Sequence, residues 1–368
     1  MQKTLKFIKA NAVMLIAALA AIITAIIVPP DKQYIDYFDF KTLSCLFCVL
    51  AVVCALRNIR FFYTLAKAII RKFNSTKKCI LALVYITFIG SMLIANDMAL
   101  LTFLPLGYFV LHTTGKEKYM AFTFIMQNIA ANLGGMLTPF GNPQNLYLYS
   151  KFNIPDLEFI KIMLPPFAVS ITLITVCCIV FVKNEPLVIE EKAASLPTAR
   201  VAVYLVLFAL SILMVFNLFH YLIGVLIIAL ALVFLDRRAL LEVDYGLLLT
   251  FVFFFIFSGN MARIDAVRDF FSFLLEKNTL VISALSCQFI SNVPSAILLS
   301  QFTDNYKELL LGVNIGGAGT MIASLASLIT FREFSKQEPG HTASYVLKFT
   351  LFNFAFLGIL ILFCSFWR

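Results

Sequence analysis

The chain has 368 residues, of which 61% are hydrophobic and only 13% are charged, and its formal net charge is +9. A soluble domain carries roughly 25% charged residues, so this composition excludes an ordinary soluble protein and predicts a polytopic membrane protein. The basic residues are concentrated in segments such as 57–78, whereas the segment 31–42 contains three aspartates. This positive-inside distribution argues against a nucleic-acid partner. It predicts a multi-pass protein of the cell (inner or plasma) membrane, with the N-terminus in the cytoplasm and the C-terminus outside.

The N-terminal segment resembles a signal peptide only superficially. Three lysines precede an apolar run, but the run is too long for a typical signal-peptide core, and no A-x-A site leads into Pro29 and Pro30. We interpret residues 1–41 as a region with a retained transmembrane helix. Most of the eight cysteines lie inside apolar runs without nearby histidine or acidic partners, so we expect them to pack rather than to carry metal or redox chemistry. We expect no cofactor, with Na⁺ or H⁺ acting only as a coupling ion.

In chain order, apolar runs predict spans at 10–28, 42–56, 119–150, 161–182, 200–217, 219–235, 245–258, 309–331 and 344–366. The runs 119–150 and 309–331 are interrupted by helix-breaking residues. Residues 59–73 and 261–275 are amphipathic and are predicted to lie along the membrane surface. Two further regions each have two apolar arms joined by a polar tip: 79–95 with 98–112, and 279–290 with 295–302. Because arms of ~8–17 residues are short for crossing a bilayer, we predict re-entrant hairpins.

The order of these elements repeats. A span, a surface helix, a hairpin, a broken helix and a span occur in 42–183 and again in 244–368, with a linker of two transmembrane helices in 184–243. The second unit starts an odd number of crossings after the first, so the two units are predicted to be inverted in the membrane. Inverted repeats with broken helices are typical of secondary transporters whose binding site lies near the membrane midplane.

The first broken helix contains the sequence TPFGNPQN at 138–145. Pro139 and Pro143 interrupt the helical hydrogen bonds, and Asn142 is a good N-cap for a half-helix that begins at Pro143. Such a half-helix presents free N–H groups that can hold an anion. The second broken helix has the matching sequence GVNIGGAGTMIASLASLITF at 312–331, where Asn314 and several glycines loosen the helix and Thr320 and Ser324 supply hydroxyl groups.

The hairpin tips carry the remaining polar groups. Asn96 and Asp97 are predicted to cap a helix beginning at Met98, and Ser291 and Asn292 to cap one beginning at Pro294. An ionisable side chain at membrane depth is a functional hypothesis by default. Asp97 is therefore either an N-cap carboxylate or a ligand for Na⁺ or H⁺, and the sequence leaves both readings open.

The motifs ANDMALLTFLP, NLGGMLTPFGNPQNL, SNVPSAILLS and GGAGTMIASLASLITF resemble the ion transporter superfamily, in particular its arsenite/anion permease and citrate-transporter-like branches, which are related to divalent anion:sodium symporters. The resemblance covers nearly the whole chain in order. It implies a homodimer with an elevator-type fold, in which a scaffold domain forms the interface. A transport domain, containing both hairpins and both broken helices, slides across the bilayer.

The resemblance also implies a site made from each tip and its neighbouring break, with the anion between the tips. The implied substrate-binding residues are Asn96, Asn142, Asn145, Ser291, Asn292 and Thr320. The implied coupling-ion residues are Asn96, Asp97, Thr138, Gly141, Asn314, Gly317 and Ser324, with Na⁺ at Asp97, Asn96 and Asn292. In the dicarboxylate branch the tips read Ser-Asn-Thr. Here both threonines are missing and the first serine is Ala95, which favours the arsenite/anion permease branch.

These observations predict an ion-coupled (Na⁺ or H⁺) secondary transporter of a small anion, either an oxyanion or a di- or tricarboxylate such as citrate. Because no lysine or arginine is near either tip in the sequence, we expect half-helix N-termini, asparagines, hydroxyl groups and a bound cation to meet the anion's charge. The alternative is Na⁺/H⁺ antiport through Asp97. An intramembrane enzyme is disfavoured, because the sequence contains neither H-E-x-x-H nor G-x-S-x-G.

Overall fold

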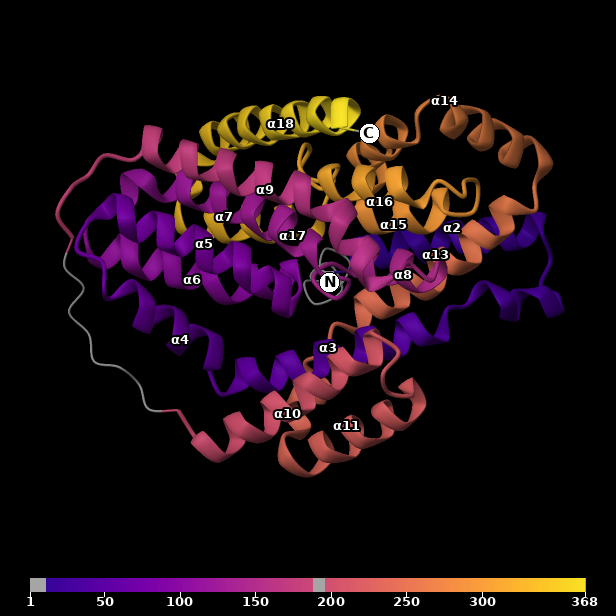
Figure 1. Ribbon diagram of the computed structural model, residues 1–368, viewed down its shortest axis with the longest axis horizontal. Coiled ribbons are helices and arrows are strands. Elements are labelled where there is room, and N and C mark those ends of the chain that lie inside the picture. The colour runs from indigo at the N-terminus through magenta and orange to yellow at the C-terminus, as the bar shows by residue number, and fades with distance from the viewer. Residues whose placement is uncertain (1–10, 188–195, 368) are drawn as a thin grey trace.

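The structure is a computed structural model that describes residues 11–187 and 196–367, and these residues form helices joined by loops (Figure 1). The first half contains α2 (Ala12–Ile27), α3 (Phe40–Asn58), α4 (Phe61–Ile70), α5 (Thr76–Ile94), α6 (Asn96–Thr113), α7 (Met120–Gly134), α8 (Pro143–Lys151) and α9 (Asp156–Phe181). The second half contains α10 (Thr198–Val215), α11 (Tyr221–Leu235), α12 (Arg237–Leu241), α13 (Tyr245–Ala262), α14 (Asp265–Ile290), α15 (Asn292–Leu299), α16 (Tyr306–Ile315), α17 (Leu325–Gln337) and α18 (Thr342–Trp367).

Seven helical segments of the described residues are long and apolar enough to cross a membrane: α3, α5, α9, α10, α13, α14, and α18 together with the short helix Pro339–His341. This confirms a helical, polytopic membrane protein. The predicted span 10–28 corresponds to α2, although residue 10 lies outside the described residues. The prediction for 219–235 corresponds to α11, which is shorter than a full span.

The helices form two groups that meet at the broken helices. α5, α6 and α7 lie side by side at the left of Figure 1, and α14, α15 and α16 pack together at the upper right. α8 reaches from the first group to α15 and α16, while α17 packs against α6 and α7. α10, α11 and α12 pack against α3 on the lower side of the view.

Helices occur near the positions predicted for both hairpins and for the two amphipathic segments, with two differences. The arms of the first hairpin, α5 and α6, have 19 and 18 residues, longer than the sequence suggested. At ~1.5 Å per residue α5 is about long enough to cross the bilayer core, so arm length supports re-entrance only for the second hairpin. In that hairpin, non-helical Asn278 separates the amphipathic start of α14 from the short arm that ends at Ile290.

Ion pairs hold the loop that follows the first hairpin, between α6 and α7. Lys116 and Lys118 each donate a hydrogen bond of 2.6 Å to the carboxylate of Glu185, which follows α9, and Tyr119 donates a third at 3.1 Å. These hydrogen bonds, led by the one from Lys116, lower the pKa of Glu185 to about 2. The loop between α6 and α7 is thereby held against the end of α9.

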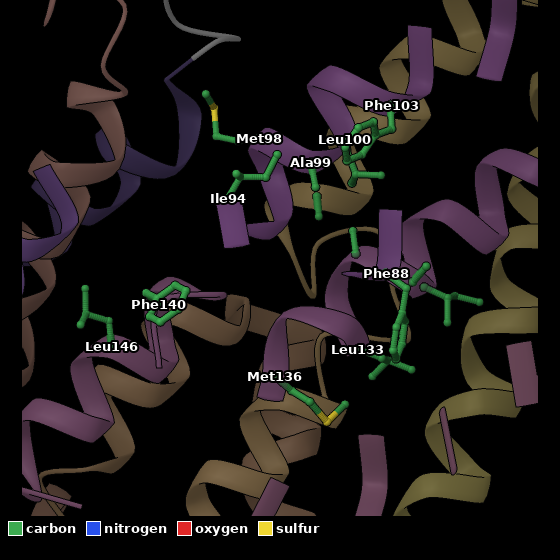
Figure 2. Packing of buried hydrophobic residues seen from close by; sticks show 14 of the residues in the cluster. Phe88, Ile94, Met98, Ala99, Leu100, Phe103, Leu133, Met136, Phe140 and Leu146 are labelled. Atoms are coloured by element: carbon green, nitrogen blue, oxygen red, sulfur yellow. The ribbon is translucent and has the colours of Figure 1, made fainter. Parts of the chain in front are cut away.

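Apolar side chains from both arms and from the first broken helix pack around the first tip (Figure 2). Ile94, Leu100 and Leu133 are fully buried there, as is Met136. The backbones of α5 and α7 lie close together at Gly134, where an added Cβ would be 2.2 Å from the carbonyl oxygen of Phe88. The absence of a side chain at Gly134 therefore allows α7 to pack directly on α5.

Gly134→Ala is expected to destabilise the protein by about 1–3 kcal/mol, because the new methyl group overlaps a backbone atom that cannot move independently. The measurement is the melting temperature of the purified protein in detergent. Gly358→Ala in α18 is the matched control, since nothing lies within 4 Å of its added Cβ. Equal melting temperatures for the two variants would show that α5 and α7 do not pack as described.

Candidate functional site

Each hairpin tip sits on the break of a helix. Ala95 and Ser291 have positive φ angles of 59° and 76°, an uncommon conformation for residues other than glycine, and each directly precedes a helix. The next backbone N–H groups donate to the breaks: Asn96 to the carbonyl of Gly141 at 3.2 Å, and Asn292 to that of Ala323 at 2.9 Å. The helices therefore begin at Asn96 and Asn292, two residues before the predicted starts.

Each tip is also held by a threonine side chain of its break, through equivalent hydrogen bonds. The hydroxyl of Thr138 donates to the Met92 carbonyl at 2.6 Å, and that of Thr320 donates to the Gln288 carbonyl at 3.0 Å. The acceptors Met92 and Gln288 each lie three residues before the positive-φ residue of the tip. The two threonines each lie four residues before the residue that precedes the following half-helix, which is Asn142 for α8 and Ser324 for α17. The two tip-and-break units therefore share the same local hydrogen bonds.

Buried amides satisfy the backbone carbonyls that the breaks leave without helical partners. Nδ2 of Asn145 lies within 3.3 Å of the carbonyl oxygens of Gly135, Met136 and Thr138. In the second break, Nε2 of Gln288 contacts the carbonyl of Gly316 at 2.9 Å. This hydrogen bonding explains how irregular backbone is tolerated in the buried interior.

A cluster of amides joins the two broken helices through Asn314. Its Oδ1 accepts hydrogen bonds from Asn142 at 3.2 Å and from Gln144 at 3.5 Å, and its Nδ2 donates to Oδ1 of Asn145 at 2.6 Å. Asn142 precedes α8 with Pro143 at the first helical position, as predicted. Its side chain makes no cap hydrogen bond and instead binds the other broken helix.

Both tips open into one cavity of about 440 Å³. This volume is within the ~300–1,000 Å³ range of small-molecule sites. The predicted site residues that line it are Asn96, Asp97, Ser291, Asn292 and Ser324. The lining does not include Thr138, Gly141, Asn142, Asn145, Asn314, Gly317 or Thr320. The rest of the wall is largely apolar and comes from α2, α8, α13, α14, α15 and α17.

Asp97 is a polar residue of the cavity with an oxygen that accepts no hydrogen bond from the described part of the chain. Its Oδ1 is buried and has no hydrogen-bond partner among the described residues, so this oxygen does not cap α6. Oδ1 of Asn142 and Oε1 of Gln144 are likewise buried without donors. Ser324, by contrast, caps α17 by accepting from the N–H of Ala326 at 3.3 Å. Carboxylate and amide oxygens are the ligand type that hard cations prefer.

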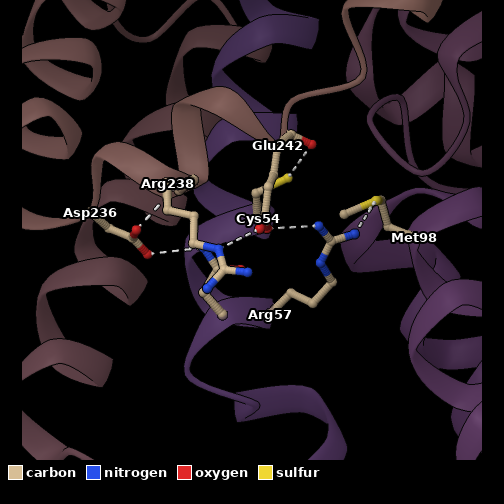
Figure 3. Close-up of polar contacts among 8 residues, drawn as sticks. Cys54, Arg57, Met98, Asp236, Arg238 and Glu242 are labelled. Carbon is tan, nitrogen blue, oxygen red and sulfur yellow. Dashed lines mark hydrogen bonds and ion pairs between the residues drawn. The ribbon is translucent and has the colours of Figure 1, made fainter. Parts of the chain in front are cut away.

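The expectation that no basic side chain is near either tip is wrong. Arg332 of α17 lines the same cavity as both tips, although it is remote from them in sequence. Arg57 of α3 lies beside the first tip, with its Nη1 3.8 Å from Sδ of Met98 (Figure 3). Sequence distance from the tips was the wrong criterion, because α17 and α3 are brought there by tertiary packing.

Other residues of the site were missed by the sequence reasoning. Asp244 and Gln144 line the cavity, and Oδ1 of Asn132 accepts from Nδ2 of Asn96 at 3.1 Å. A signal for Asn132 was present, because NLGG at 132–135 in the first break corresponds to NIGG at 314–317 in the second. No comparable pattern marks Asp244 or Arg332.

Comparison with known proteins agrees with the motifs. Residues 1–306 match the family model described as citrate transporter. An uncharacterized transporter of Methanocaldococcus jannaschii is 34% identical over 296 residues, which cover 80% of this chain and 81% of that protein. The inner membrane protein YbiR of Escherichia coli is 28% identical over 309 residues, which cover 82% of each chain. The chain therefore belongs to the citrate transporter family of membrane transporters.

Proposed function

We propose that this chain is an ion-coupled secondary active transporter of a small anion, an oxyanion or a di- or tricarboxylate such as citrate, driven by Na⁺ or H⁺. The observation that carries the proposal is the shared cavity, in which the two tips, the cap of α17 and Arg332 meet. Arg332 supplies positive charge for an anion, and Asp97 supplies a carboxylate for the coupling cation. Because the rest of the wall is apolar, it offers few other polar groups to which the anion or the cation could bind.

The proposed mechanism is elevator alternating access with two inverted repeats, 42–183 and 244–368. The matching hydrogen bonds of the two tip-and-break units support this symmetry. The transport domain contains both hairpins and both broken helices. The scaffold contains the remaining helices and forms a homodimer interface in the cell membrane, with the N-terminus inside and the C-terminus outside.

Anion binding is tested by thermal stabilisation of the purified protein with citrate, succinate, sulfate, phosphate or arsenite, each in sodium and in choline salts. A ligand that binds only the folded state raises the melting temperature by mass action. We expect one anion class to stabilise the protein more in sodium, or more at low pH if the coupling ion is H⁺. If no anion stabilises it under any condition, the anion transporter proposal fails.

The second candidate is Na⁺/H⁺ antiport, which the unpartnered Oδ1 of Asp97 in the cavity favours. An antiporter moves Na⁺ against a pH gradient without any anion, whereas a symporter needs the anion for Na⁺ movement. Flux of ²²Na⁺ into proteoliposomes with and without the stabilising anion distinguishes the two. Anion-independent flux supports antiport.

A further inference from the structure

A second cavity of about 310 Å³ lies between the corner of α3 and α4 and the middle of α6. It shares no lining residue with the cavity at the tips. Its walls carry two guanidinium groups, from Arg57 and Arg60, together with Tyr63 and Thr102. Two neighbouring arginines are the chemistry that binds a phosphate, whereas the Thr102 hydroxyl already donates to the Met98 carbonyl at 2.8 Å.

The charge of this second cavity is only partly balanced by the protein. Arg57 pairs with Glu242 at 3.1 Å, but the same carboxylate also accepts from Arg238 at 2.8 Å, so one negative charge is shared by two arginines (Figure 3). The Arg60 side chain has no hydrogen bond or ion pair with any residue that the structure describes. The cavity therefore has a net positive charge.

Exposed apolar side chains lie next to this charge. α4 exposes the apolar side chains of Leu65 (51%) and Ile69 (37%), as expected for a helix lying in the interfacial region of a membrane. On α6, Pro105 has no N–H to donate to the carbonyl of Leu101, and both residues line the cavity. The usual helical hydrogen bond from residue 105 to that carbonyl is therefore missing.

We propose that the second cavity binds the headgroup phosphate of an anionic glycerophospholipid, with Arg60 as the principal ligand and Arg57 as the second. Basic pockets between helices at the membrane surface commonly take such headgroups. The lipid would bridge α3 and α4, which precede the first hairpin in the chain, to α6, the second arm of that hairpin. The inference rests on membrane embedding and does not depend on which ion or anion is transported.

The test uses the full chain, purified and delipidated in detergent, with phosphatidylglycerol, phosphatidylcholine or glycerol 3-phosphate added. Thermal stabilisation and native mass spectrometry report binding. We expect stabilisation by phosphatidylglycerol and an about fivefold weaker apparent affinity for Arg60→Gln, the factor that one arginine near a membrane surface contributes. Arg71→Gln is the matched control, since this exposed arginine at the other end of α4 does not line the cavity.

Three results would overturn the proposal: wild-type affinity in Arg60→Gln, equal binding of phosphatidylcholine, or equal stabilisation by glycerol 3-phosphate, which would mean a soluble ligand. If Arg60→Gln does not fold, the proposal is tested by the salt dependence of phosphatidylglycerol binding to the wild-type protein. A phosphate held by guanidinium groups binds more weakly as NaCl is raised, so salt-independent binding of phosphatidylglycerol contradicts the assignment.

Discussion

Asp97→Asn is expected to abolish coupling while leaving a folded protein that is at least as stable as the wild type. The carboxylate is buried at Oδ1 and has no partner there, so folding must bear the cost of removing it from water. The neutral amide has the same shape and a smaller desolvation cost. We expect anion uptake driven by the ion gradient to fall at least ~10-fold, while the melting temperature stays the same or rises.

Uptake into proteoliposomes, with and without a sodium or pH gradient, is the measurement for Asp97→Asn. Asp269→Asn is the matched control, because that aspartate is exposed on the first part of α14 and pairs only loosely with Arg268 at 3.7 Å. Unchanged sodium and pH dependence in Asp97→Asn would remove Asp97 from the coupling site. The proposal that the cavity binds an anion would be unaffected, because it rests on Arg332 and the two tips.

Asn314→Ala is expected to separate the two broken helices and to abolish transport. The substitution removes the side-chain acceptor of Gln144 and one of the two acceptors of Asn142, which keeps its hydrogen bond to the Asn132 carbonyl. It also leaves Oδ1 of Asn145 without its donor. An unsatisfied buried group costs about 1–3 kcal/mol, although hydrogen bonds between membrane helices often contribute less, about 0.6 kcal/mol. A total loss of about 1–3 kcal/mol in stability, with transport reduced at least ~10-fold, is the expected result.

The control for Asn314→Ala is Asn305→Ala on the same helix. Asn305 caps α16 by accepting from Glu308, outside the amide cluster, so its loss costs about 1 kcal/mol without touching the site. Melting temperature and transport rate are measured for both variants. If Asn314→Ala transports at the wild-type rate, the amide cluster does not set the geometry of the tips.

The sequence by itself determined the elements and their order. Apolar length predicted the spans, and amphipathic patterns predicted α4 and the first part of α14. Pro143 after Asn142 predicted the start of α8, because proline is favoured at the first position of a helix, where its missing N–H leaves no helical hydrogen bond unmade. These features are local, so composition and spacing are enough to specify them. The family resemblance, carried by four ordered motifs, was confirmed by the comparisons.

Only the tertiary structure decided what faces the cavity. Asn142 looked like a cap, yet its side chain binds Asn314, because a buried amide facing the opposite broken helix finds a partner there. Asn145 supports the carbonyls of the first break and does not line the cavity. Arg332 enters the cavity because α17 packs beside the first hairpin. Such contacts depend on how distant helices pack, and side-chain direction across a helix interface is not encoded in the spacing of any single segment.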